Sequence, residues 1–160
     1  FKGGKGIKQY DYFLKTVNSA MAVKDINGDG IEDVLIPSGI IWMQGESDAD
    51  KTETIANQYY SNLKKLMGLM RATFRNNDLP IVIGKISDSG DDTDGKVWRF
   101  GELVQYGQEK FALVEPNVTI VRTTNSYKYS DRYHYDNNGF IDLGKQFANS
   151  IFLLNNRKKN

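Results

Sequence analysis

Two residues near the end of the chain have the types and spacing of an acid–base pair. The only histidine, His134, follows Asp131 by three residues. At this spacing the carboxylate can fold back on the imidazole and fix its tautomer, while the other ring nitrogen takes a proton from a serine. A lone histidine in a tyrosine-rich turn can also be an ordinary surface residue, and Asp131 alone can simply cap a turn. Their pairing favours catalysis and predicts a hydrolase.

A second fragment places polar groups after an apolar run. Residues 39–43 are Gly-Ile-Ile-Trp-Met, and Gln44, Gly45 and Glu46 follow directly. Short continuous apolar runs are typical of buried parallel strands, and open α/β sheets bind ligands at the carboxyl ends of their strands. Gln44 can satisfy backbone groups there, as many buried amides do. We expect Gly45 to allow a close backbone approach or a φ value that other residues avoid.

The two fragments together resemble a known family. Residues 42–49, Trp-Met-Gln-Gly-Glu-Ser-Asp-Ala, resemble the third conserved block of the sialate O-acetylesterase and carbohydrate esterase family six branch of the SGNH hydrolases, which includes acetylxylan-esterase-like enzymes. Asp131 and His134, with Gly139, Leu143-Gly144 and Ala148, resemble the last block of that branch. The resemblance extends over residues 38–150. It implies that Asp131 and His134 are catalytic, and that Gln44 donates to the oxyanion with Gly45 in the same loop. We expect Glu46 to hold this loop by pairing with a cation such as Arg71.

The chain departs from the family where the nucleophile belongs. It has no counterpart of the Gly-Gln-Ser-Asn block that supplies the serine, nor of the block whose glycine amide lines the oxyanion hole. We therefore expect the nucleophile outside this chain, in a missing amino-terminal segment that is its partner. Gly45-Glu-Ser47-Asp-Ala49 matches four-fifths of a Gly-x-Ser-x-Gly elbow, but Ala49 replaces the second glycine. Ser47 is accordingly an unfavoured nucleophile.

The resemblance implies a fold and an activity. The fold is a three-layer α/β/α sandwich with a parallel sheet, flavodoxin-like, whose first strands are missing from this chain. Residues 1–160 then form one domain, the carboxyl-terminal two-thirds of an SGNH esterase. The activity is release of acetate from an acetylated carbohydrate, without an organic cofactor, although the isolated chain is expected to be inactive. Two alternatives stay open: a non-catalytic carbohydrate-binding or interaction module, and a calcium-dependent structural module.

Periodicity supports alternating helices and strands. We expect strands at 39–43, 80–86 and 118–121, where apolar runs are short and continuous. Apolar residues at helical spacing predict helices at 10–24, 55–74, 97–113 and 138–154, the second beginning with a capping box of Asp50 and Glu53. This order favours a parallel sheet between helices.

One further motif predicts a metal. Asp25, Asn27, Asp29 and Asp33 stand at positions one, three, five and nine of an EF-hand-type loop, with Gly30 at position six. Position twelve is Ile36 in place of glutamate, so a structural calcium would bind weakly within an insertion at 25–38. The alternative is an uncomplexed Asp/Asn/Gly turn.

Composition excludes several function classes. The 160 residues carry a net charge of +1, which gives no reason to expect nucleic acid or an anionic membrane as partner. The absence of cysteine excludes disulfides and thiol catalysis. The resemblance favours a secreted or periplasmic bacterial protein, whereas the composition leaves the compartment open. Four tyrosines surround His134 and are either a platform for a sugar ring or packing residues: Tyr127, Tyr129, Tyr133 and Tyr135.

Overall fold

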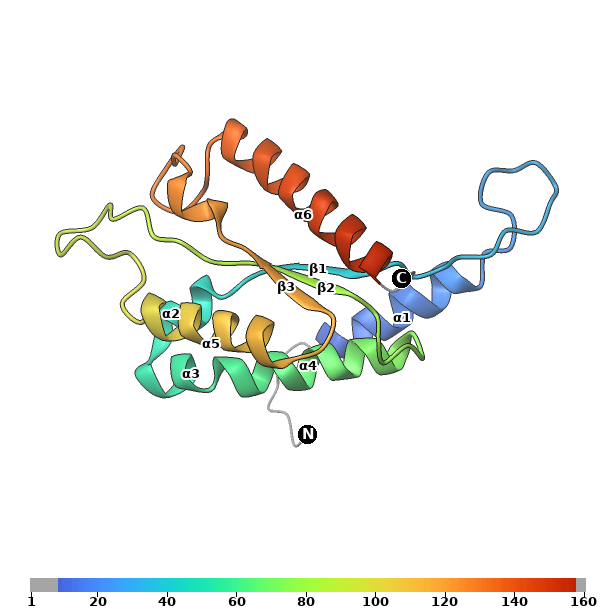
Figure 1. Cartoon of the computed structure of the whole chain (residues 1–160), viewed down its shortest axis with the longest axis horizontal. Helices are drawn as coiled ribbons and strands as arrows, with labels where there is room; N and C mark the ends of the chain where they lie inside the picture. The colour runs from blue at the N-terminus through green and yellow to red at the C-terminus, as the bar shows by residue number, and fades with distance from the viewer. Residues whose placement is uncertain (1–8, 158–160) are drawn as a thin grey trace. The chain divides into compact units, whose positions relative to one another are not determined.

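The computed structural model describes residues 9–157, which divide between Pro37 and Ser38 into two compact units (Figure 1). The first unit contains the helix α1 (Gln9–Met21) and, from residue 25 to 37, a segment without helix or strand. The expected helix at 10–24 is therefore present but ends earlier, and the predicted insertion has no regular structure. The prediction of a single domain over residues 1–160 stays a prediction.

The second unit is built on a parallel sheet. Strands β1 (Ile40–Met43), β2 (Ile81–Gly84) and β3 (Val118–Val121) lie in the order β1-β2-β3. Ile40 is paired with Ile81, and Ile81 with Val118. All residues of the central strand are buried, as a continuous apolar sequence in a sheet covered on both faces requires. The three expected strands are confirmed.

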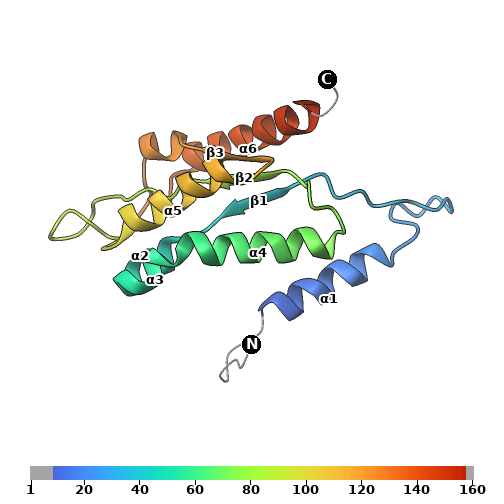
Figure 2. The same cartoon turned by 60° about the horizontal axis from the view of Figure 1, so that its bottom comes forward.

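Helices cover both faces of this sheet. Leu63 and Met67 of α4 (Tyr59–Thr73) and Phe111 of α5 (Gly101–Val114) pack with Ile81 and Ile83 on one face. On the other face α6 (Asn137–Arg157) contributes side chains to a second cluster. That cluster contains Val82, Val121, Leu143, Phe147 and Leu154. Figure 2 shows α4 and α6 on opposite sides of the strands. The expected α/β/α class with a parallel sheet is correct.

The chain after β1 differs from the single long helix that the sequence predicts. It forms α2 (Glu46–Lys51), α3 (Glu53–Asn57) and α4 in succession. The expected capping box of Asp50 and Glu53 is wrong, because Thr52 is the N-cap and its hydroxyl accepts a hydrogen bond from Ile55 N at 3.2 Å. The helix expected from residue 97 begins at Gly101, and a short 3₁₀ helix, η1 (Thr123–Ser126), follows β3.

The outer edge of β1 is open in the described part of the chain. Among residues 9–157, only β2 pairs with β1, and Ile41 on this strand is 53% exposed. An unpaired strand edge offers backbone donors and acceptors to a further strand. Within the same residues, none of the helices is long and apolar enough to cross a membrane.

Candidate active site

The Asp131–His134 turn lies at the tip of a short hairpin after β3 and η1. Tyr129 and Tyr135 form an isolated antiparallel bridge, and the Ser130 amide donates to the carbonyl of His134 at 2.9 Å. The turn itself is fixed by Asp131 Oδ1, which accepts from the backbone amides of Tyr133 at 2.7 Å and His134 at 2.9 Å. This local side-chain-to-backbone pattern explains why a three-residue spacing brings the two side chains together.

The carboxylate and the imidazole are in hydrogen-bond contact. His134 Nδ1 lies 2.8 Å from Asp131 Oδ2 and 3.0 Å from Oδ1. The backbone amide of Tyr133, followed by the His134 side chain, holds the pKa of Asp131 below its usual value. The His134 side chain is 65% exposed, and its Nε2 has no hydrogen-bond partner within residues 9–157. One ring nitrogen is thus oriented by a carboxylate, and the other is accessible to a proton donor.

Gln44 follows β1 at the edge of the sheet that also bears the carboxyl end of β3. Its side-chain Nε2 donates to Asp48 Oδ2 at 2.7 Å, and its carbonyl accepts from the Tyr59 hydroxyl at 2.7 Å. Gly45 has φ +150°, and a Cβ there would lie 2.8 Å from Cγ1 of Val104. Both expected reasons for glycine at this position are confirmed: an unusual φ and a close approach.

A buried glutamine connects the ends of two strands to α5. Gln108 is fully buried; its Nε2 donates to the carbonyls of Gln44 at 3.1 Å and Gly84 at 3.3 Å. Its Oε1 accepts from the Ile86 amide at 3.0 Å. Gln108 is not among the residues expected from the sequence. The available signal was a polar side chain on the buried face of the helix, four residues after Val104.

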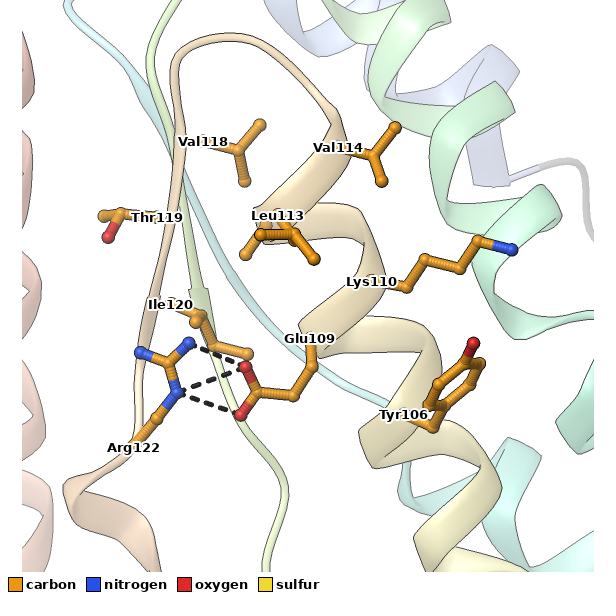
Figure 3. A pocket seen from close by; sticks show the side chains of 10 residues that line it. Tyr106, Glu109, Lys110, Leu113, Val114, Val118, Thr119, Ile120 and Arg122 are labelled. Carbon is orange, nitrogen blue, oxygen red and sulfur yellow. Dashed lines mark hydrogen bonds and ion pairs between the residues drawn. The ribbon is translucent and has the colours of Figure 1, made fainter.

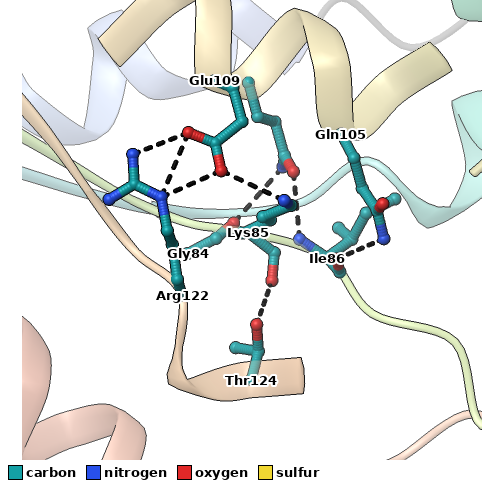
Figure 4. A network of polar contacts seen from close by, with 8 residues as sticks. Gly84, Lys85, Ile86, Gln105, Glu109, Arg122 and Thr124 are labelled. Atoms are coloured by element: carbon teal, nitrogen blue, oxygen red, sulfur yellow. Dashed lines mark hydrogen bonds and ion pairs between the residues drawn. The ribbon is translucent and has the colours of Figure 1, made fainter. Parts of the chain in front are cut away.

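Charged side chains also link the ends of β2 and β3 to α5 (Figure 4). Glu109 on α5 lies 2.6 Å from Arg122, just after β3, and 3.0 Å from Lys85, just after β2. The Arg122 side chain is the main reason that the pKa of Glu109 is lowered. Thr124 Oγ1 also donates to the Lys85 carbonyl at 2.7 Å. The carboxyl ends of all three strands are therefore held by side chains of α5 and η1.

The loop after β2 supports the histidine hairpin. Ser87 is buried, and its hydroxyl contacts the hydroxyls of Tyr129 at 2.7 Å and Tyr135 at 2.9 Å. Asp88 accepts from the amides of Val97 at 3.0 Å and Trp98 at 2.8 Å, which closes the acidic loop at residues 88–95. Ser87 thus positions the hairpin, and Asp88 fixes the acidic loop; nothing in the spacing of Ser87 along the chain indicated this role.

The expected pairing of Glu46 with Arg71 is wrong. Arg71 is buried on α4 and donates to the carbonyls of Leu79 at 3.0 Å and Pro116 at 2.9 Å. These carbonyls precede β2 and β3, at the amino edge of the sheet, whereas Glu46 follows the carboxyl end of β1. Arg71 therefore satisfies buried backbone acceptors far from the loop that it was expected to neutralise. Ser47 is exposed in the first turn of α2.

The Asp25 loop folds around its own backbone amides. Asp25 accepts from the amides of Gly28 at 2.8 Å and Gly30 at 2.9 Å, and Asp33 accepts from the Ile26 amide at 2.7 Å. Asn27 Nδ2 contacts Asp29 Oδ2 at 3.0 Å. In the described part of the chain, no three acidic, histidine or cysteine side chains are grouped as metal ligands would be. The observed contacts suit the turn interpretation, and calcium binding stays a prediction.

A pocket of about 500 Å³ lies elsewhere, between α5 and β3 (Figure 3). Tyr106, Lys110 and Leu113 line it from the helix, and Val118 and Ile120 line it from the strand. None of the residues expected to act in catalysis belongs to its lining. Asp131 and His134 are instead exposed on the hairpin after η1.

The chain matches one protein family along nearly all of its length. A family model described as "Carbohydrate esterase, sialic acid-specific acetylesterase" matches residues 2–153. The chain belongs to this family. The expected relationship to the sialate O-acetylesterase branch is therefore confirmed, and the hairpin and the strand-end loop lie within the matched region. A search of curated proteins finds no match.

Solved structures show the same fold as this member of the acetylesterase family. An X-ray structure of a protein from Arabidopsis thaliana is 21% identical, with a TM-score of 0.68 over 92% of this chain. A carbohydrate acetylesterase from Xanthomonas citri is 23% identical, with a TM-score of 0.58 over 71% of this chain. The matches cover 53% and 25% of those two chains. The chain thus spans about half of the first structure and a quarter of the second.

Proposed function

We propose that this chain forms the acid–base part of a carbohydrate O-acetyl esterase whose nucleophilic serine comes from a further segment of the same protein. The observation that supports this most strongly is the contact of 2.8 Å between His134 Nδ1 and Asp131 Oδ2, with the histidine side chain exposed. Gln44 follows the end of β1, at the carboxyl edge of the sheet. Family membership and the Xanthomonas citri structure, described as a carbohydrate acetylesterase, support this substrate class. Acetylated carbohydrate is the proposed partner, with no organic cofactor.

The proposed reaction is a double displacement. His134 takes the serine proton at Nε2 while the hydroxyl attacks the acetyl carbonyl, and then returns the proton to the sugar oxygen that leaves. Water then attacks the acetyl–serine ester: His134 takes a proton from the water and returns it to the serine oxygen as the ester bond breaks, which releases acetate. Asp131, in contact with Nδ1, fixes the tautomer and stabilises the imidazolium.

Gln44 is the proposed donor to the oxyanion, in the loop that Gly45 allows to form. Its side-chain amide has two N–H groups, and Asp48 accepts from this nitrogen at 2.7 Å. That contact leaves the amide a second N–H for the developing negative charge. Removal of one such donor typically costs about 3 kcal/mol of transition-state stabilisation.

The serine-bearing segment has a proposed docking place at β1. The outer edge of this strand is unpaired in the described residues, and its side chain Ile41 is 53% exposed. A parallel strand added there would end beside Gln44, because the carboxyl ends of parallel strands share one edge. The serine is thereby brought to the edge that bears His134.

The test uses the 160-residue chain together with the segment that supplies the serine. His134→Ala should reduce the rate constant of acetyl-ester hydrolysis by at least about a thousandfold while folding is retained. Lys128→Ala, an exposed change in the same hairpin, is the matched control and should leave the rate within about twofold. Equal rates for the two variants would eliminate His134 as the base. Hydrolysis by the 160 residues alone that Ser47→Ala abolishes would instead make Ser47 the nucleophile.

A further inference from the structure

The four tyrosines near His134 do not share one environment. Tyr135 is 8% exposed, Tyr129 contacts the buried Ser87 hydroxyl, and the Tyr127 hydroxyl donates to Asp142 at 2.6 Å. Burial, assisted by the Asp142 contact, raises the pKa of Tyr127 to about 12. These three rings are packing residues. Tyr133 differs, since it is 52% exposed at the tip of the hairpin.

Tyr133 lies between the histidine and a second aromatic ring. Its ring centroid is 6.4 Å from that of His134, with an interplanar angle of 81°. The ring of Trp98, from the loop before α5, is 5.7 Å from Tyr133 at 40°. We call Trp98 and Tyr133 the aromatic shelf. Two chain segments thus place a partly exposed aromatic surface directly beside the exposed imidazole.

Polar contacts hold the shelf in place without help from a ligand. The indole N–H of Trp98 donates to the Ser87 carbonyl at 3.2 Å, and its backbone amide donates to Asp88 at 2.8 Å. On the other side, the Ser89 hydroxyl donates to the Arg132 carbonyl at 2.8 Å, and the Arg132 side chain pairs with Asp92. Trp98 is therefore fixed to the start of the acidic loop, and Ser89 and Asp92 fasten this loop to the hairpin beside Tyr133, so both rings are preorganised.

We propose that the aromatic shelf binds the sugar ring of the acetylated substrate, with the C–H groups of the sugar against the tyrosine face. The electron-rich face of an aromatic ring attracts the weakly positive hydrogens of a C–H surface, whereas the sugar hydroxyls stay in water. A ring stacked on Tyr133 presents a substituent to the adjacent His134. This inference rests on the proposed function and identifies the part of the substrate that the exposed tyrosine recognises.

The experiment measures sugar binding to the 160-residue chain by NMR saturation transfer and titration, independently of hydrolysis. The probes are an O-acetylated sialic acid, an O-acetylated methyl xyloside and their two deacetylated parents. At least one acetylated probe should bind, with saturation strongest at the ring C–H protons. Tyr133→Ala and Tyr133→Leu should each weaken binding by about tenfold, whereas Tyr133→Phe should retain it.

Tyr106→Ala is the matched control, because Tyr106 is 67% exposed on α5 and lines the separate pocket. Its affinity for the probes should equal that of the wild type. The proposal that the aromatic shelf binds the sugar ring would be refuted if no probe bound, or if Tyr133→Ala and the wild type had equal affinity. Binding of a deacetylated parent that depends on Tyr133 supports sugar binding by the shelf even if the His134 test rejects the esterase function. Failure of the shelf proposal can therefore be distinguished from failure of the proposed function.

Discussion

Gln108 on α5 should contribute more to stability than any other single amide near the site. It is fully buried and serves three backbone groups: the Ile86 amide and the carbonyls of Gln44 and Gly84. In Gln108→Leu the side chain keeps its approximate volume but loses these contacts. The Ile86 amide then stays buried without its acceptor, which costs about 1–3 kcal/mol.

The two carbonyls lose less than the amide. Gln44 O keeps the hydrogen bond from the Tyr59 hydroxyl at 2.7 Å, and the contact with Gly84 O is long at 3.3 Å. Each lost bond is worth about 0.5–1 kcal/mol, and the apolar leucine partly offsets the total. We therefore expect Gln108→Leu to lower the free energy of unfolding by about 2–3 kcal/mol. A domain of typical stability still folds after that loss.

The assay is urea unfolding followed by circular dichroism, with amide hydrogen exchange as a local readout. Gln146→Leu on α6 is the matched control, because its amide makes only long contacts to Asp142, at 3.4 and 3.5 Å. It should change the unfolding free energy by no more than about 0.5 kcal/mol. In Gln108→Leu the Ile86 amide should also exchange faster. Equal destabilisation by both leucine variants, with unchanged exchange at Ile86, would refute the assigned role of Gln108.

Two further predictions concern pH and metal. Burial raises the pKa of Tyr59 to about 12, so the folded state keeps its phenol protonated at pH values where the unfolded chain, with a pKa near 10, releases the proton. The free energy of unfolding should therefore fall between pH 10 and 12, by up to about 2.7 kcal/mol, and be unaffected by this group below pH 10. The stability difference between wild type and Tyr59→Phe in urea unfolding should therefore narrow from pH 9 to pH 11.5, and a constant difference would contradict this. If the Asp25 loop binds calcium, millimolar calcium should raise the melting temperature relative to chelator, and Asp29→Asn should weaken the effect. Identical melting curves in calcium and in chelator would show that the Asp25 loop is an uncomplexed Asp/Asn/Gly turn.

The local sequence pattern was sufficient to predict the strands and the contact between Asp131 and His134. The strands follow from short apolar runs, because only a sheet covered on both faces buries every side chain of such a run. The Asp131–His134 contact was predictable because both residues belong to one tight turn, where spacing alone determines the distance. Helix boundaries were less accurate. Thr52 divides the segment after β1 by capping α3, and no difference in hydrophobic periodicity marks that break.

Contacts between distant segments depended on the tertiary structure. The sequence by itself selected the residues that we propose for the chemistry: Asp131, His134, Gln44 and Gly45, through local spacing and resemblance to one family. It did not determine the partner of Arg71, because the choice between Glu46 and the carbonyls before β2 and β3 depends on which edge of the sheet the helix end reaches. It also left the four tyrosines equivalent. Only packing distinguishes Tyr133, since burial of a ring is set by the segments that fold against it; Ser87, which contacts the buried Tyr135, is 48 residues away in the sequence.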